Sequence, residues 1–188
     1  MTDFALAETR AWVERAVIGL QLCPFAKAPQ VRGQVRFVVS AASDAEALLG
    51  DLVDELNRLA AAPPERVETT LLIHPRVLAD FEDHNDFLEI AEAALVALDL
   101  EGVIQIASFH PRYRFAGSAP DDIANATNRS PHPTLHLLRE DSVERALASF
   151  ADPAAIFEAN IKTMTRLGRE GWAALQRQCR DDAERERS

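Results

Sequence analysis

Strands that alternate with helices along the chain predict an α/β or α+β fold, in which helices pack on a single mixed sheet of about four strands. The main observation is that short β-branched or continuously apolar runs recur between amphipathic segments. A helical segment between two of these runs also predicts at least one βαβ crossover. We expect one globular domain over residues 1–178 and a charged, frayed C-terminal tail over residues 179–188.

The first half of the chain predicts two helices and two strands. Phe4 to Leu22 carries apolar residues at helical spacing. Val35 to Ser40 is β-branched and predicts a strand. Ser43 to about Ala61 predicts a helix, because Ser43 and the glutamate three residues later form a capping box. Thr69 to Ile73 is apolar and β-prone throughout, which predicts a buried central strand ending at His74-Pro75.

The second half repeats this alternation around one long irregular segment. Helices are expected over Phe87 to Leu98, Ser142 to Phe150, and Pro153 to Leu175 with Asp152 as its cap. Strands are expected over Val103 to Phe109 and Thr134 to Leu138. Between these strands, Pro111 to Pro131 has no clean periodicity, and only Asp121 to Ala126 indicates a short helix.

Charge and cysteine content exclude several classes of function. The formal net charge of −10 argues against binding to nucleic acid or to an anionic membrane surface. No apolar run approaches the ~20 residues that span a bilayer, and the N-terminal residues contain no apolar signal core. The two cysteines lie far apart and fit a reducing compartment. We therefore expect a cytoplasmic protein with no membrane or nucleic-acid partner.

The segment from Gly102 to Glu140 differs from the rest of this acidic chain. It carries a net positive charge from four arginines, and it contains three of the five histidines and the only tyrosine. Irregular segments often carry function, so this composition predicts a ligand site. The alternative is a long loop held to the body of the protein by hydrogen bonds.

Four side chains are candidates for catalysis. His110 and His74 each follow a strand and precede a proline. If the two strands are parallel neighbours, both histidines lie side by side at the carboxyl edge of the sheet, where ligands bind in open α/β folds. Each can act as a general acid or base, ligate a metal, or make a structural hydrogen bond. Tyr113 can orient a substrate or relay a proton. Cys23 is either a nucleophile activated by a nearby cation or a small buried hydrophobe.

The run NATNRSP predicts an anion site. Its amides, hydroxyl and forked guanidinium suit a carboxylate or a phosphate, although Asn128 can equally organise a turn. Arg139 suits an ion pair as well as a ligand. The expected ligand-binding residues are Arg112, Arg114, Asn125, Asn128, Arg129, Ser130, His136 and Arg139.

A metal site is a further alternative. His132 and His136 are four residues apart and share one face of a strand or a helix. An alternative ligand set is His74, His110 and His136, with Cys23 as a possible fourth ligand. The chain has no Cys-x-x-Cys or His-Glu-x-x-His motif to support it. The sequence leaves the cofactor unknown, and no dinucleotide fingerprint supports hydride transfer.

Four motifs resemble a known family. They are CPFAK at Cys23 to Lys27, ETTLLIHP at Glu68 to Pro75, QIASFHPRYRFAG at Gln105 to Gly117, and NRSPHPTLHLLRE at Asn128 to Glu140. Together they resemble the uncharacterised bacterial and plastid-lineage family known as domain of unknown function fourteen-fifteen. A tyrosine usually stands in that family where this chain has His132, so the resemblance favours His110 and His136 as functional histidines. It implies kinship and no particular activity.

The leading functional hypothesis from these residues is an enzyme, a hydrolase or group transferase, that acts on a small anionic metabolite. His110 is its expected general acid or base, and Arg129 with Asn128 is expected to hold the carboxylate or phosphate. The main alternative is a non-catalytic ligand-binding or regulatory module. A metal-binding protein with histidine and cysteine ligands is the third.

Overall fold

The computed structural model describes residues 2–148 and 154–187 and confirms a single mixed sheet of four strands with packed helices. The strands, in chain order, are β1 (Val35–Val39), β2 (Thr69–Ile73), β3 (Ile104–Phe109) and β4 (Thr134–Arg139). Their order across the sheet is β1-β2-β4-β3. β1 and β2 are parallel and are joined through α3 (Ala45–Ala61), so the expected βαβ unit is present. β4 runs antiparallel to both of its neighbours.

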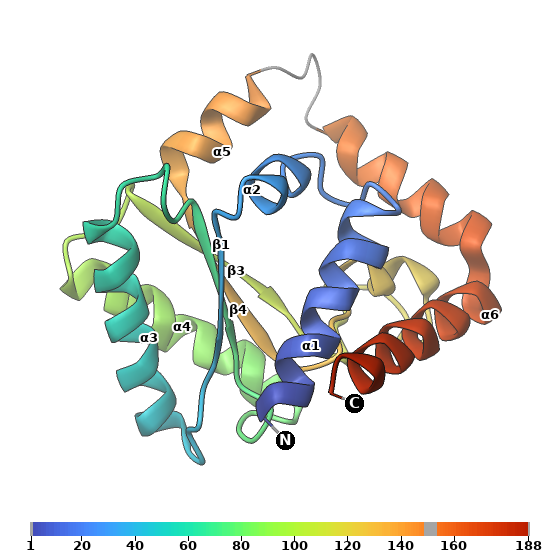
Figure 1. Ribbon diagram of the computed structural model, residues 1–188, viewed down its shortest axis with the longest axis horizontal. Helices are drawn as coiled ribbons and strands as arrows, with labels where there is room; N and C mark the ends of the chain where they lie inside the picture. The colour runs from blue at the N-terminus through green and yellow to red at the C-terminus, as the bar shows by residue number, and fades with distance from the viewer. Residues whose placement is uncertain (1, 149–153, 188) are drawn as a thin grey trace.

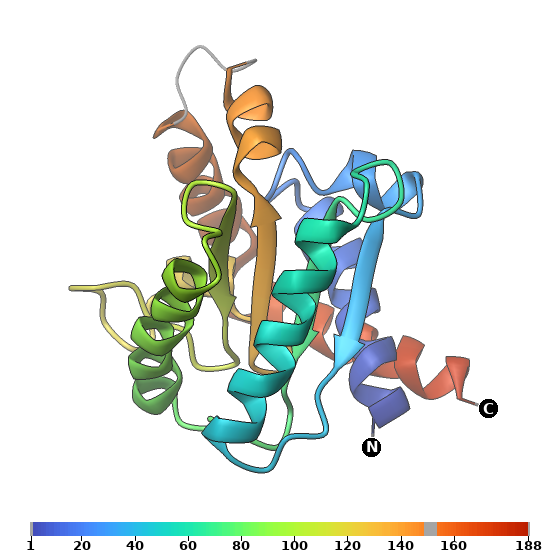
Figure 2. The same cartoon turned by 90° about the vertical axis from the view of Figure 1, so that its left-hand side faces the viewer.

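Helices cover both faces of the sheet (Figures 1 and 2). α3 and α4 (Phe81–Ala97) pack on one face, which is the face turned toward the viewer in Figure 2. α1 (Thr2–Trp12) and α6 (Ala154–Glu186) lie on the other. Successive strand residues point to opposite faces, so Leu72 joins the α3–α4 core while Leu71 joins the α1–α6 core. No helix in the described part of the chain combines the length and the apolar character needed to cross a bilayer.

The α3–α4 core is dominated by leucines of α3. Leu48, Leu52, Leu56 and Leu59 recur at helical spacing and are fully buried against the sheet. Burial of each such side chain contributes about 1.5–3 kcal/mol. Asp44 caps α3 by accepting a hydrogen bond from the Ala47 amide, so the cap lies one residue after the serine expected from the sequence.

Two further differences from the predicted helices affect the site. α4 begins at Phe81, six residues earlier than predicted, because Asp80 accepts a hydrogen bond from the Glu82 amide and caps the helix there. His84 therefore lies inside the helix rather than before it. The first helix continues as a π-helical stretch, η1 (Val13–Ile18), and is followed by a short α2 (Lys27–Val31) that the sequence did not predict.

The C-terminal segment continues as helix where the sequence predicted a frayed tail. α6 runs to Glu186, interrupted by a non-helical backbone conformation at Gly168 (φ 67°). A buried stripe at helical spacing explains the continuation, since it packs toward α1: Trp172, Leu175, Cys179 and Ala183. Arg15 also hydrogen-bonds Asp182 across the two helices. The predicted cap at Asp152 and the predicted end of the preceding helix at Phe150 lie outside the described residues; that helix, α5, spans Glu140–Leu147.

Candidate functional site

His74 and His110 lie at the same end of the sheet, but not on neighbouring strands. Both β2 and β3 run antiparallel to β4, and Ile73 and Phe109 both pair with Thr134. The two histidines therefore flank the start of β4. The ring of His84, from α4, lies 5.3 Å from that of His74 and 5.2 Å from that of His110, measured between ring centroids. All three side chains are at most 1% exposed.

The hydrogen bonds of this histidine cluster (His74, His84 and His110) define its protonation. Nδ1 of His74 lies 3.1 Å from the Val77 carbonyl, which can only accept, so Nδ1 carries the proton and Nε2 is a lone pair. Nδ1 of His110 instead accepts from the Arg112 amide at 3.0 Å, so Nε2 carries the proton. Burial lowers the pKa of His74 to about 4 and that of His84 to about 3, and it also lowers the pKa of His110. The cluster is therefore neutral at neutral pH.

This cluster is closed to solvent. Nε2 of His110 carries a proton and cannot ligate. No group of three or more His, Cys, Asp or Glu residues is arranged to hold a metal ion in the described ranges, so His74, His110 and His136 do not form the alternative metal set. A general acid or base role for His110 stays a prediction, but its side chain has no open face for a substrate.

The irregular segment after β3 is held together by its own polar side chains. Asn125 is fully buried. Its carbonyl oxygen accepts from the Phe115 amide at 3.0 Å and the Ser118 hydroxyl at 2.7 Å, and its amide donates to the Ala119 carbonyl at 2.9 Å. Ser130, also buried, donates to the His132 carbonyl at 2.6 Å.

The arginines of this segment also have partners within the protein. Arg129 donates to the Tyr113 carbonyl at 3.2 Å and to the Pro120 carbonyl at 2.8 Å. Arg112 and Arg114 form ion pairs at 2.9 Å with Asp80 and Glu82, respectively, at the start of α4. The positive charge that distinguished the segment is thus balanced by acidic residues about thirty positions earlier in the sequence.

Tyr113 and Asn128 take part in the same packing. The Tyr113 ring makes edge contacts with Phe81, at 5.3 Å between centroids, and with Phe115, at 5.1 Å. Burial raises the pKa of its hydroxyl, although a hydrogen bond to the Asn128 side chain opposes the shift. The phenol is therefore protonated at neutral pH.

His132 lies apart from the other histidines, between α1 and α6. Its Nε2 lies 2.9 Å from the carboxylate of Glu8, which is buried and also lies 3.4 Å from the guanidinium of Arg180. This contact joins the segment to the N-terminal and C-terminal helices. His132 lies beside Glu8 and His136 beside Thr69, so the two histidines have different surroundings.

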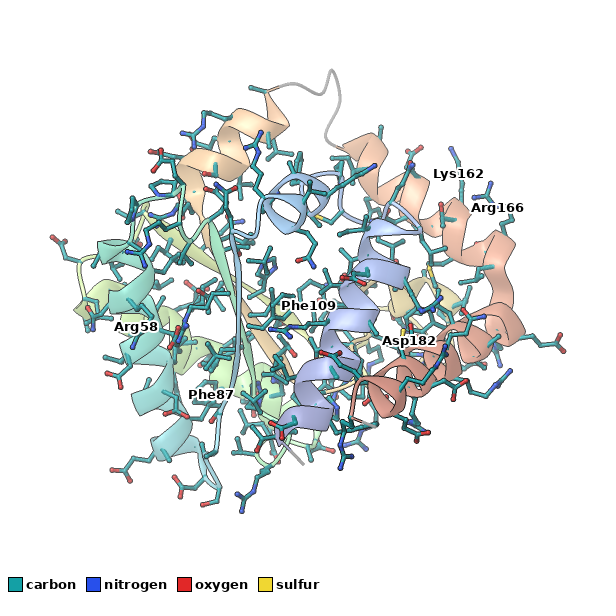
Figure 3. The ribbon with its side chains drawn as sticks, viewed as in Figure 1. Arg58, Phe87, Phe109, Lys162, Arg166 and Asp182 are labelled. Atoms are coloured by element: carbon teal, nitrogen blue, oxygen red, sulfur yellow. The ribbon has the colours of Figure 1, made fainter. Side chains whose placement is uncertain are left out.

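A large open pocket lies on the α1 face of the sheet. It has a volume of about 760 Å³ and is enclosed by the sheet, the end of α1, η1, α2 and α5. Figure 1 shows α2 and α5 at the same end of the sheet, and Figure 3 labels Phe109, which packs edge-on against Trp12 at 5.2 Å. The walls are mostly apolar: Trp12, Val13, Val17, Phe25, Val35, Leu71, Ala107, Phe109, Leu138 and Val143.

His136 is an ionisable residue on the sheet side of this pocket. It occupies the middle of β4, opposite Leu71 on one side and Ala107 on the other. Nε2 lies 2.7 Å from the Thr69 hydroxyl, which itself donates to the Leu137 carbonyl at 2.6 Å. Surrounding protein atoms lower the pKa of His136 to about 4, although part of its surface remains accessible in the pocket.

Polar residues at the margin of the pocket include two of the expected site residues. Cys23 is half-buried, and burial raises the pKa of its thiol, so the group is a protonated thiol rather than a reactive thiolate. Arg139 donates to the carbonyls of Leu59, Ala62 and Val67 at 2.6–3.1 Å, which fixes the C-terminal end of α3 to β4. One terminal nitrogen makes all three of these contacts, whereas Nε of Arg139 is buried without a hydrogen-bond partner among the described residues.

Sequence reasoning missed most of this pocket. It selected Cys23, His136 and Arg139 for other reasons, but not Thr69, Gln105, Ala107 or Phe109. The signal was the alternation within β3 and β4, which places Gln105, Ala107 and Phe109 on one face with His136. A histidine in the middle of a strand, on the face lacking the leucines of α3, marked the position.

The fold and the site define an α+β protein with an apolar pocket on one face of its sheet. Residues 5–174 match the family described as "Protein of unknown function (DUF1415)", and the chain belongs to that family. The resemblance of its four motifs to this family is thus confirmed. Comparison with curated proteins and with solved structures found no significant match.

Proposed function

We propose that this protein binds a small, largely apolar molecule in the pocket on the α1 face of its sheet. The observation that supports the proposal is the pocket itself, about 760 Å³ in volume and walled by aliphatic and aromatic side chains. Ligand sites are typically concave, about 300–1,000 Å³ and predominantly apolar, with a few polar groups that fix orientation. His136 and Gln105 on the floor are such groups.

The same surroundings favour binding over catalysis. A histidine with a pKa of about 4 is a weak base at neutral pH, and the half-buried thiol of Cys23, whose pKa is raised, is a weak nucleophile. The pocket margin contains Arg32, Arg139 and Arg145 but also Glu65 and Glu68, so its charge does not select strongly for an anion. The ligand-binding module thus has more support than the hydrolase or transferase acting on an anionic metabolite.

A substitution that fills the pocket tests this proposal. Ala107 faces the pocket beside His136, and Ala107→Leu adds three methylene-sized groups into open space. The probe is N-phenyl-1-naphthylamine, a neutral dye whose fluorescence rises in apolar surroundings. We expect saturable binding to the wild type and at least roughly tenfold weaker binding to Ala107→Leu, a loss of about 1.4 kcal/mol.

Ala60→Leu provides the matched control. Ala60 is exposed on α3, away from the pocket, so the same change there is expected to leave the dye affinity unaltered. Circular dichroism establishes that both variants fold. Equal dye binding by the wild type and Ala107→Leu, or no binding by the folded wild type, would contradict the proposal. Conversion of a bound compound that disappears in His136→Gln would show an enzyme instead.

A further inference from the structure

The hydrogen bonds around His136 fix which of its nitrogens carries the proton. The Thr69 hydroxyl has one proton and lies 2.6 Å from the Leu137 carbonyl, which can only accept. That proton is therefore directed to Leu137. The hydroxyl oxygen must then accept from its other neighbour, Nε2 of His136, at 2.7 Å. Nε2 carries the imidazole proton, and Nδ1 is left as a lone pair.

Nδ1 of His136 is available to a ligand. Among the described residues this nitrogen has no hydrogen-bond partner. Ring nitrogens of His74, His84 and His110 are both buried and without a partner, but Nδ1 of His136 is not among these buried atoms. The accessible part of His136 faces the pocket. Its ring neighbours are apolar, with Phe109 at 6.0 Å between centroids and Leu71 and Ala107 opposite on the adjoining strands.

The ring stays neutral over the physiological pH range. Burial alone lowers its pKa, with no carboxylate contributing an opposing effect. The charged groups that line the same pocket are Arg139, at the end of the same strand, and four residues outside β4: Arg32, Glu65, Glu68 and Arg145. At neutral pH the floor of the pocket therefore presents a hydrogen-bond acceptor and not a cation.

We infer that the pocket selects apolar molecules that carry a neutral hydrogen-bond donor, a hydroxyl or an N–H group, and directs that donor to Nδ1 of His136. This inference rests on the proposed ligand-binding function. A ligand carboxylate, ether or ketone would bring a lone pair against the lone pair of Nδ1. A buried acceptor left without a partner is unfavourable, so sites built around such a group discriminate against ligands that lack the matching donor. Thr69 acts as a positioning residue, because it sets the tautomer without touching the ligand polar group.

Two neutral naphthalenes of similar size separate donor from acceptor. The probe 2-naphthol carries a hydroxyl, whereas 2-methoxynaphthalene carries an oxygen that can only accept. We expect the wild type to bind 2-naphthol about fivefold to tenfold more tightly, the effect of one hydrogen bond between neutral groups. Binding is measured by isothermal titration calorimetry, and ¹⁵N NMR of the histidine ring is expected to show the proton of His136 on Nε2.

Thr69 and Thr70 offer a matched pair of substitutions. They are adjacent on β2 and point to opposite faces of the sheet, and both are buried. Thr69→Val removes the acceptor for Nε2–H, so we expect the preference for 2-naphthol to fall below about twofold and the ring proton to redistribute between Nδ1 and Nε2. Thr70→Val removes a hydroxyl that has no hydrogen-bond partner, so both the preference and the tautomer are expected to persist.

The outcomes distinguish this inference from the function on which it rests. Equal binding of both naphthalenes to the wild type would overturn the selection for a donor while leaving the pocket a binding site. A proton on Nδ1 in the ¹⁵N spectrum would also overturn it. If neither naphthalene binds and N-phenyl-1-naphthylamine does not bind either, the proposed function fails, and this inference fails with it.

Discussion

Two regions of this protein carry versatile polar side chains, and they differ in whether those groups already have partners. In the irregular segment from Pro111 to Pro131, amides, guanidinium groups and hydroxyls form hydrogen bonds to nearby carbonyls and carboxylates. On the pocket face, His136 keeps one nitrogen accessible amid apolar walls. A high density of polar residues in a sequence thus identifies a loop that needs internal hydrogen bonds as readily as it identifies a ligand site.

Burial gives the two regions a physical reason to differ. In this long segment the regular structure is limited to a short 3-10 helix, η2 (Ile123–Asn128). Its other backbone groups need partners of another kind, and Asn125, Arg129 and Arg112 provide them. A pocket for an apolar ligand needs few polar groups, because each unpaired one disfavours burial of the ligand. The residues that bind a ligand in such a pocket are therefore largely the apolar ones.

The largest expected effect is the pH dependence of stability, to which both the histidine cluster and His136 contribute. In the unfolded chain each histidine titrates near pH 6.5, whereas the folded pKa values are about 4 for His74, about 3 for His84 and about 4 for His136. The unfolded state therefore binds more protons near pH 5. Stability is fully present above about pH 7 and is lost as the pH falls toward 4. We expect a slope of roughly 3–4 kcal/mol per pH unit near pH 5 in urea denaturation.

A single substitution shows how much of this slope comes from the histidine cluster. His84→Phe removes one titrating ring from the cluster and should lower the slope by about 1.4 kcal/mol per pH unit, the share of one proton. Comparing slopes rather than midpoints separates proton binding from any change in packing. An unchanged slope would mean that His84 is protonated in the folded protein, and the cluster would then be a charged and accessible group.

The next effect tests whether the irregular segment depends on its internal hydrogen bonds. Asn125→Ala removes an acceptor for the Phe115 amide and the Ser118 hydroxyl. The amide is left without a partner, whereas the hydroxyl keeps the Phe115 carbonyl at 2.8 Å. We expect the free energy of unfolding to fall by about 2–3 kcal/mol. Asn57→Ala is the control, because Asn57 is exposed and bonds only to its own helix at Val53, so its removal is expected to change stability by less than about 0.5 kcal/mol. Equal small effects would indicate that Asn125 is free to bind a ligand.

Much of the fold could be predicted because it depends on local periodicity. The four strands and the βαβ unit follow from the β-branched runs and from the helix between the first two. The early start of α4 was missed because Asp80 was one of several acids able to cap it. The continuation of α6 beyond Leu175 was missed because a charged sequence gives a weak sign of the buried stripe that faces α1.

The site was predicted less well, because it depends on contacts between distant parts of the chain. The partners of Arg112 and Arg114 lie at the start of α4, and nothing near these arginines indicates them. β4 lies between β2 and β3, so His74 and His110 do not follow neighbouring strands. The ring of His84, from helix α4, contacts both of their rings. The pocket forms between elements that are far apart in sequence, so no short motif marks it.

The smallest expected effect decides the role of Arg129, the residue that the sequence most strongly suggested for anion binding. Its guanidinium donates through two nitrogens to the carbonyls of Tyr113 and Pro120, sixteen and nine residues away. Lysine keeps the charge but has no planar fork to reach both carbonyls. We expect Arg129→Lys to lower the free energy of unfolding by about 1–2 kcal/mol. Arg114→Lys, which keeps a surface charge beside Glu82, is expected to change the free energy of unfolding by less than about 0.5 kcal/mol.

Denaturation of both variants is compared with titration of inorganic phosphate. If Arg129→Lys left stability unchanged but weakened phosphate binding, Arg129 would be an anion ligand and the irregular segment a second binding site; a loss of stability alone would make it the clamp that holds the segment in place.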